Sequence, residues 1–74
     1  MAAVPMPDDC FLHTVKVWGV RDGRKVWRAG QRLFTWDSKH GEVEVFDLRG
    51  VHLGVLNAAG KAVKKAVKGR RLNV

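Results

Sequence analysis

Apolar and polar residues alternate through most of the chain, in short runs separated by turn-forming residues. The alternation begins at His13 with HTVKVWGV and returns in KVWR, RLFTWD, EVEVFD and VHLGVL. These runs are rich in β-branched and aromatic residues, which favour strands. The segments between them contain Gly or Asp, and Asp22-Gly23 is a strong signal for a two-residue hairpin turn. The pattern predicts a mainly β protein with about five strands in an antiparallel meander.

The short length adds a constraint on this sheet. A chain of 74 residues forms one small domain, and a single sheet of that size must be highly twisted to enclose a core. We therefore expect one domain over residues 1–74. Residues 1–12, which include both prolines, are expected to be a loose lead-in, and residues 58–74 a basic tail.

The tail contains the segment KAVKKAVK, which has two interpretations. As two helical turns it would place Lys61, Lys64, Lys65 and Lys68 on one face. Because so short an isolated helix is marginal in water, we favour a basic C-terminal arm or a final irregular strand.

Charge is distributed unevenly along the chain. The net charge is +7; residues 1–47 carry seven basic and seven acidic side chains, whereas residues 48–74 carry seven basic and none acidic. An excess confined to the last third points to a polyanionic partner such as RNA, DNA or an anionic membrane surface, with a solubilising tail as the alternative.

The aromatic and sulfur-containing residues give weaker signals. Trp18, Trp27 and Trp36 recur at a spacing of nine; we interpret them as core or sheet-face residues, with base stacking as the alternative. The single cysteine, Cys10, excludes an internal disulfide, and we expect it to be a small apolar residue near a terminus. It has a metal-like spacing to His13, but no second pair follows, so no metal site is expected.

No apolar run approaches the roughly 20 residues of a membrane-spanning helix. The N-terminal residues also lack the basic start and apolar stretch of a signal peptide. The sequence therefore predicts neither membrane insertion nor export.

The segment WDSKHGEVEV concentrates the residues with chemical potential. On a strand that begins at Glu42, the side chains of Glu42 and Glu44 share one face, which we expect to point outward, while the valines face the core. Asp37 ends the preceding strand, and His40 lies in the turn. A tight hairpin brings Asp37, His40 and at least one glutamate within a few ångströms of one another.

Such a group fits RNA cleavage by the ribose 2′-OH. A glutamate can take the hydroxyl proton, a histidine held by a carboxylate can protonate the leaving oxygen, and an arginine from the tail can stabilise the phosphate charge. Nothing in this scheme requires a metal or another cofactor. Two alternatives remain at this stage: the charges are ordinary surface groups, with the glutamates paired to Lys39 or Arg32, or the protein binds RNA without cutting it.

The segments QRLFTWDSKHGEVEVF and GVHLG resemble the cytotoxic ribonuclease domain of the ribosome-cutting E-type colicins. The likeness covers residues 30–57 well and the tail loosely. It implies a single, highly twisted antiparallel sheet. It also implies an endoribonuclease toxin that cuts small-subunit ribosomal RNA in the decoding site, leaves a 2′,3′-cyclic phosphate and stops translation.

The resemblance also implies roles for particular residues. Glu44 corresponds to the base, and His40, oriented by Asp37, to the acid or phosphate stabiliser; Glu42 is not carried over. The active-site arginine corresponds to Arg70, because Leu72 then takes the place of the family's apolar residue, with Arg71 as the alternative. We expect the RNA-binding cations to be Lys39, Lys61, Lys64, Lys65, Lys68 and Arg71.

Two further positions, Phe34 and His52, bear on the resemblance. Phe34 stands where the family often has tyrosine, so a hydroxyl near the phosphate is missing. His52, in the His-Leu-Gly turn, is interpreted as a structural turn residue, with a substrate contact as the alternative.

The expected partners follow from this resemblance and the charge. They are the ribosome with its small-subunit RNA, and an acidic immunity or antitoxin protein over the basic face. We expect no membrane partner and a monomer when free. The toxin would act in the cytoplasm, delivered there if it belongs to a larger toxin; a start at Met1 favours a stand-alone member of a toxin–antitoxin pair over an excised domain.

Overall fold

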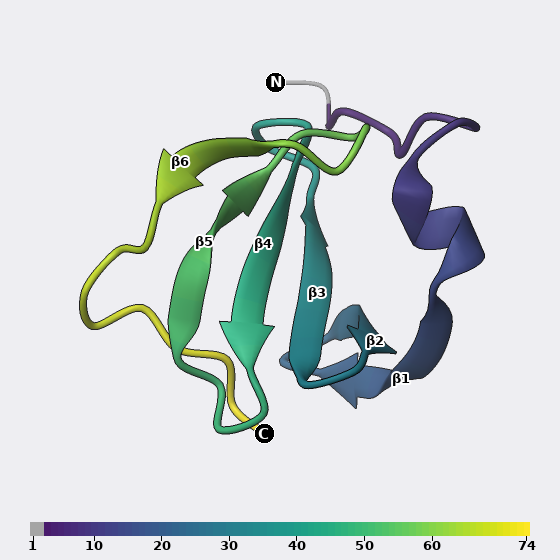
Figure 1. Cartoon of the computed structure of the whole chain (residues 1–74). Helices are drawn as coiled ribbons and strands as arrows, with labels where there is room; N and C mark the ends of the chain where they lie inside the picture. Colours follow the sequence, from purple (N-terminus) through teal and green to yellow (C-terminus); the bar gives the residue numbers. More distant parts are fainter. Residues whose placement is uncertain (1–2) are drawn as a thin grey trace.

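The computed structural model describes residues 3–74, which form one open sheet of six antiparallel strands in sequential order (Figure 1). The strands are β1 (Lys16–Arg21), β2 (Arg24–Ala29), β3 (Arg32–Asp37), β4 (Glu42–Asp47), β5 (His52–Leu56) and β6 (Ala62–Lys65). The prediction of a mainly β fold built on one antiparallel meander is confirmed, with one strand more than expected.

The first strand begins later than the sequence pattern indicates. His13 and Thr14 belong to a short 3-10 helix, η1 (Phe11–Thr14), and β1 starts only at Lys16. The hydroxyl of Thr14 donates a hydrogen bond of 2.7 Å to the carbonyl of Phe11, a local contact that competes with strand pairing. The following turn is as predicted, because Asp22 and Gly23 have φ values of 54° and 73°, as a type I′ turn requires.

The tail is neither a helix nor a free arm. Residues Ala62–Lys65 pair with β5, so the alternative of a final strand is correct for this part. Successive side chains of a strand point to opposite faces, and Lys64 and Lys65 therefore diverge instead of sharing the single basic face that a helix would give.

Beyond β6 the chain folds back against the start of β5. The backbone N–H of His52 donates to the carbonyl of Arg70 over 3.2 Å, and that of Leu72 donates to the carbonyl of Gly50 over 2.8 Å. Gly50 has a φ of 84°, and a Cβ there would collide with the carbonyl oxygen of Leu72. The close approach of the tail therefore depends on glycine at this position.

The N-terminal segment is held more firmly than the expected loose lead-in. Cys10 and Leu12 are buried in the core. Val4 donates its N–H to the carbonyl of Ser38 over 2.7 Å, and its own carbonyl accepts a 3.0 Å hydrogen bond from Nε1 of Trp36. This segment thus covers one face of the sheet despite having no regular structure before Phe11.

Apolar residues are buried on both faces of the sheet. One cluster joins the N-terminal segment to the sheet and contains Cys10, Leu12, Trp27, Phe34, Val43 and Val45. The other joins the tail to the opposite face and contains Val26, Leu33, Phe46 and Leu72. Trp27 and Trp36 thus belong to the core or its margin, as predicted, whereas Trp18 is exposed. No helix in the described part of the chain is long and apolar enough to span a membrane.

Candidate active site

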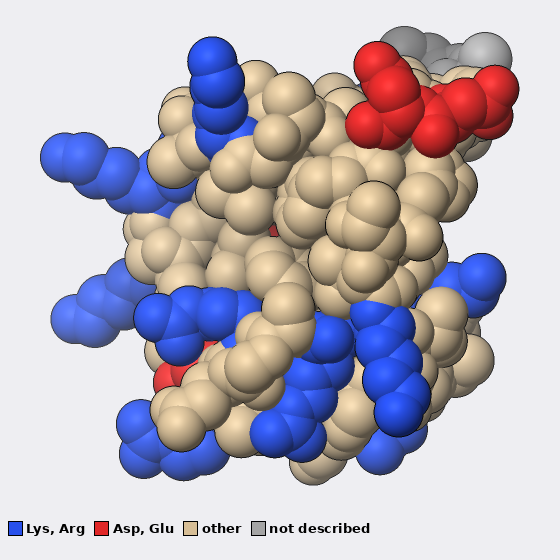
Figure 2. Space-filling view, turned by 45° about the vertical axis from the view of Figure 1, so that its right-hand side comes forward, with Lys and Arg blue, Asp and Glu red and all other residues tan. Residues whose placement is uncertain are grey.

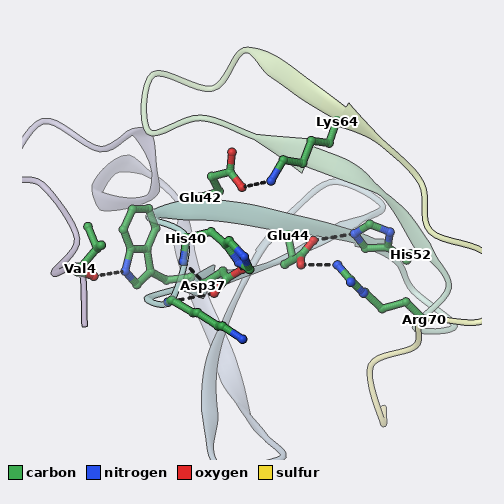
Figure 3. A network of polar contacts seen from close by, with 10 residues as sticks. Val4, Asp37, His40, Glu42, Glu44, His52, Lys64 and Arg70 are labelled. Carbon is green, nitrogen blue, oxygen red and sulfur yellow. Dashed lines mark hydrogen bonds and ion pairs between the residues drawn. The ribbon is translucent and has the colours of Figure 1, made fainter. Parts of the chain in front are cut away.

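The turn between β3 and β4 fixes Asp37 and His40 against each other. The Asp37 carboxylate accepts hydrogen bonds from the backbone N–H groups of Lys39 (3.0 Å) and His40 (3.3 Å), and from Nδ1 of His40 at 2.7 Å (Figure 3). Because a carboxylate only accepts, Nδ1 of His40 carries the proton in this contact. Nε2 is then the ring nitrogen left for a substrate.

The same contacts keep Asp37 ionised. Burial raises the pKa of Asp37, but hydrogen bonds from the His40 side chain and from the backbone of Lys39 and His40 outweigh it, so the pKa lies below the ordinary value. Asp37 is therefore an anion that orients His40 over the pH range in which the protein is expected to act.

Glu44 lies in the middle of β4 and is almost fully buried. Its two carboxylate oxygens have different partners: Oε1 accepts from the Arg70 guanidinium at 2.7 Å, and Oε2 lies 2.6 Å from Nε2 of His52. The Arg70 side chain is 45% exposed, whereas that of His52 is completely buried. Glu44 thus has one partner at the surface and one fixed in the core.

The hydrogen bonds of His52 define its tautomer. Its Nδ1 accepts a 2.9 Å hydrogen bond from the backbone N–H of Val67, so Nδ1 carries no proton. The proton must then sit on Nε2, which donates it to Glu44. His52 is therefore a neutral residue that links the Glu44 carboxylate to the backbone of the tail.

His52 is consequently not the turn residue predicted. It is the first residue of β5, buried against Phe46, whose ring centroid lies 5.4 Å from that of the imidazole. Sequence reasoning missed its pairing with Glu44. Strand alternation could not have found this pairing, because it groups His52 with Gly54 and Leu56, which lie opposite Val45 and Val43 on the other face. A register shift between Val45 and Phe46 brings His52 to the face of Glu44.

Glu42 has a separate partner. It accepts a 2.8 Å hydrogen bond from Nζ of Lys64 in β6 (Figure 3). Within residues 3–74 it forms no hydrogen bond or ion pair with His40 or Arg70. The expectation that both glutamates point outward is wrong for Glu44. The two do share a face, opposite the valines, but the tail folds over that face and buries Glu44 while leaving Glu42 near the rim.

Most of these groups, but not the buried His52, line one cleft of about 640 Å³. Its walls include all four predicted catalytic residues, Asp37, His40, Glu44 and Arg70. Three of the predicted RNA-binding cations, Lys39, Lys64 and Arg71, also line it, whereas Lys61, Lys65 and Lys68 do not. Arg71 donates to the carbonyl of Arg49 over 3.2 Å, so it is Arg70 that reaches Glu44.

The cleft also has a buried hydroxyl beside the glutamate. Thr35 lies opposite Glu44 in the β3–β4 register, lines the cleft and is 1% exposed. Its Oγ1 has no hydrogen-bond partner among residues 3–74. A buried hydroxyl without a hydrogen bond costs free energy. The Thr35 hydroxyl is therefore a polar group in the cleft wall that residues 3–74 leave free to form a hydrogen bond.

Fold and site together define a class: small basic proteins in which a histidine–aspartate pair and an arginine-bound glutamate share a cleft on one twisted sheet. The family model described as Cytotoxic matches residues 12–73, and the chain belongs to this family, the cytotoxic ribonuclease domain of E-type colicins. It is thus a colicin-like toxin domain. The match takes in the first hairpin, where the sequence motifs gave no resemblance. Comparisons with curated proteins and with solved structures returned no match.

Proposed function

We propose that this protein is an endoribonuclease toxin that cuts small-subunit ribosomal RNA in the decoding site and so stops translation. The observation that carries the proposal is the pair of polar contacts in one cleft, Asp37 with His40 and Glu44 with Arg70. They supply an acid, a base and a cation, which are the three groups that attack by a ribose 2′-OH requires.

Each residue has a distinct role in this proposal. Glu44 removes the 2′-OH proton, and the oxygen attacks the adjacent phosphorus. His40, held by Asp37 through Nδ1, delivers a proton from Nε2 to the departing 5′-oxygen. The products are a 2′,3′-cyclic phosphate and a free 5′-hydroxyl, so no water and no metal-bound nucleophile enter this step.

Arg70 connects substrate binding to the base. Its guanidinium is half-exposed and bonded to Oε1 of Glu44, so an incoming phosphate competes with the carboxylate for it. Transfer of Arg70 to the phosphate leaves Oε1 free to accept the 2′-OH proton, while His52 still holds Oε2. The arginine then stabilises the charge that develops on the phosphate.

The surroundings of the cleft support a polyanionic substrate. Lys39, Lys64 and Arg71 surround the acid–base groups, and Lys61, Lys65 and Lys68 extend the positive charge along the tail. The producing cell would need protection from such a toxin. We propose that an acidic immunity or antitoxin protein provides it by covering this positive charge. A screen that recovers only neutral or basic binding proteins would contradict it.

Cleavage of ribosomes tests the proposal. The protein is incubated with intact ribosomes in magnesium buffer, and new RNA ends are mapped by primer extension. The expected result is one new end in the decoding region, with a 2′,3′-cyclic phosphate on the upstream fragment. A short RNA containing that region should be cut in EDTA as well, if the reaction needs no metal.

Three variants assign the roles. Glu44→Gln and His40→Ala are expected to lower the rate by about 10²- to 10⁴-fold each, the usual contribution of a general acid or base. Glu42→Gln, on the same face of the same strand, is the matched control and should stay within about threefold of the unmodified protein. RNA that is bound but never cut would instead favour the non-catalytic RNA-binding module.

A further inference from the structure

The first hairpin is strongly basic, although residues 1–47 as a whole carry no net charge. Residues 16–32 carry six basic side chains and one acidic one, whereas the remainder of residues 1–47 carries one basic and six acidic. The expectation that the excess charge lies only in the last third is therefore incomplete. We call residues 16–32 the basic hairpin; its cations are Lys16, Arg21, Arg24, Lys25, Arg28 and Arg32.

The β1–β2 register places like charges directly opposite each other. Lys16 faces Arg28, and Arg21 faces Arg24. None of the six cations forms an ion pair within residues 3–74, although Lys64 and Arg70 of the tail are each paired with a glutamate. Like charges opposite each other destabilise a sheet, so the hairpin keeps an arrangement that works against folding.

Such an arrangement is typical of a surface that meets a polyanion. Proteins often retain destabilising charge where binding needs it, because the partner removes the repulsion in the complex. Figure 2 shows most of the basic side chains of this view in the lower part of the molecule, where Figure 1 places the β1–β2 hairpin, with a few others at the upper left. The largest acidic patch lies at the opposite, upper right corner. The hairpin thus lies on the side of the molecule away from the main acidic patch.

An aromatic side chain lies among these cations. Trp18 sits at the β-bulge between Val17 and Gly19 and is 37% exposed. The guanidinium carbon of Arg21 lies 4.6 Å from the centroid of its ring. A bulge redirects a side chain away from the regular pleat, and an exposed indole with neighbouring cations is the combination on which nucleic-acid bases stack.

The basic hairpin also borders the catalytic cleft. Its turn residue Asp22 and the adjoining Arg24 line the cleft that contains Glu44 and Arg70. The carboxylate of Asp22 accepts a 3.3 Å hydrogen bond from the backbone N–H of Asn73, which joins the turn to the tail. An RNA strand that leaves the cleft past Arg24 therefore reaches the hairpin directly, and the one acidic side chain at its turn, Asp22, is already bonded to the tail.

We infer that the basic hairpin is a second RNA-contact surface, which holds single-stranded RNA beyond the scissile phosphate. Lys16 and Arg28 contact phosphates, and Trp18 stacks on a base. The choice of RNA rests on the proposed function; the charge segregation and the exposed indole do not.

Binding measured without cleavage tests this surface. The probe is a single-stranded RNA whose riboses are 2′-O-methylated, so that the nucleophile is blocked and the result does not depend on catalysis. Affinity is measured between about 0.05 and 0.4 M salt for the unmodified protein and for Lys16→Gln/Arg28→Gln. Loss of two phosphate contacts should reduce the slope of log affinity against log salt by about 1.4, and the affinity at about 0.1 M salt by roughly 25-fold.

Two further measurements separate binding from folding. The double variant should unfold at the same temperature as the unmodified protein or a higher one, because the like-charge pair is relieved. Arg49→Gln is the matched control, since Arg49 is exposed, lies outside the hairpin and is paired with Asp47. Compared singly, Lys16→Gln should lower the slope by about 0.7 and Arg49→Gln should leave it unchanged.

Trp18→Leu provides an independent check. Loss of one stacked base should weaken binding by about 5- to 100-fold without changing the salt slope. An unchanged slope in Lys16→Gln/Arg28→Gln overturns the proposal, as does weaker binding that is accompanied by a lower unfolding temperature. Equal RNA binding with lost affinity for vesicles of phosphatidylglycerol and phosphatidylcholine would assign the hairpin to an anionic lipid surface instead.

Discussion

Nε2 of His52 lies 2.6 Å from Oε2 of Glu44, and the imidazole that makes this contact is entirely buried. The two residues are on adjacent strands, and the opposite ring nitrogen of His52 is bonded to Val67 of the tail. The carboxylate proposed as the base is therefore held from behind by a group that no substrate reaches. This arrangement gives His52 a positioning role. Two conservative substitutions can separate its hydrogen bond to Glu44 from its hydrogen bond to Val67.

Replacing His52 by Gln or Asn retains one half of its hydrogen bonding in each case. The Gln amide nitrogen occupies the place of Nε2 and can donate to Glu44, whereas the Asn carbonyl occupies the place of Nδ1 and can accept from Val67. We expect His52→Asn to lower kcat by about 10- to 100-fold with little change in KM, because the charged carboxylate loses a donor. His52→Gln should recover much of the rate.

A spectroscopic measurement accompanies these kinetics. Long-range proton–nitrogen correlation of the imidazoles should show His52 protonated on Nε2 only, with that signal displaced in Glu44→Gln. Equal rates for the Asn and Gln variants would remove the positioning role, while a doubly protonated ring would contradict the assigned tautomer. Neither result would bear on whether the protein cleaves ribosomal RNA.

Gly50 is expected to control the docking of the tail. Gly50→Ala places a Cβ against the carbonyl of Leu72 at a position with φ of 84°, so the tail must shift. Leu72 then leaves its buried cluster and Arg70 leaves Glu44. We expect a loss of stability of about 1–3 kcal/mol by denaturant unfolding and a larger proportional loss of cleavage.

Gly23→Ala is the control for this substitution. Gly23 has a similar φ of 73°, but a Cβ there meets nothing within 4 Å. Gly23→Ala should introduce a similar backbone strain but leave Arg70 in place. Cleavage per folded molecule should therefore be retained. Equal loss of cleavage in both variants would show that the tail does not depend on Gly50.

The stability of the site is expected to depend on pH through Asp37. Its pKa in the folded protein is lower than the ordinary value, so the unfolded chain binds more protons in the interval between the two. The contribution of Asp37 is therefore complete above the ordinary value and is lost as the pH falls through the folded one. Asp37→Asn should be less stable than the unmodified protein at about pH 6, and the difference should shrink towards about pH 2.

Denaturant unfolding at several pH values measures this difference. Asp9→Asn provides the control, because Asp9 is exposed and its side chain forms no ion pair in the described part of the chain. Its stability relative to the unmodified protein should not change with pH in the same way. A difference for Asp37→Asn that grows as the pH falls would mean that folding raises the pKa of Asp37, contrary to the contacts described.

The N-terminal segment is expected to contribute to the core. Leu12 in η1 is completely buried, so Leu12→Ala should lower the free energy of unfolding by about 2–5 kcal/mol. Leu53→Ala is the control, because Leu53 is 38% exposed on β5 and its truncation leaves no cavity. If both variants lose similar stability, the segment before β1 is not part of the folded core.

Local patterns predicted the sheet but not what covers it. Alternation and turn residues located β2 to β5 closely, and correctly placed Glu42 and Glu44 on one face, because these features depend on near neighbours. The burial of Glu44 depends on a tail that docks 26 residues further along the chain. The periodicity of the strands does not show where the tail docks. The expected exposure of Glu44 therefore described a sheet over which no tail was folded.

The candidate site also combines contacts that the sequence could predict with contacts that it could not. The Asp37–His40 contact spans three residues within one turn and follows from spacing. Arg70 was selected only by resemblance to a family, and the geometry that brings it rather than Arg71 to Glu44 comes from long-range folding. His52 was missed because a strand pairing, not its sequence position, brings it to Glu44.

The return of the tail to β5 has a consequence for synthesis. Translation proceeds from the N-terminus, so β3 and β4, with Asp37, His40 and Glu44, are made well before Val67 and Arg70. A partly made chain holds the proposed acid and base but lacks Arg70 and the backbone group that orients His52. The order of residues in the gene thus delays assembly of the cleft until the segment through Leu72 has left the ribosome that makes it.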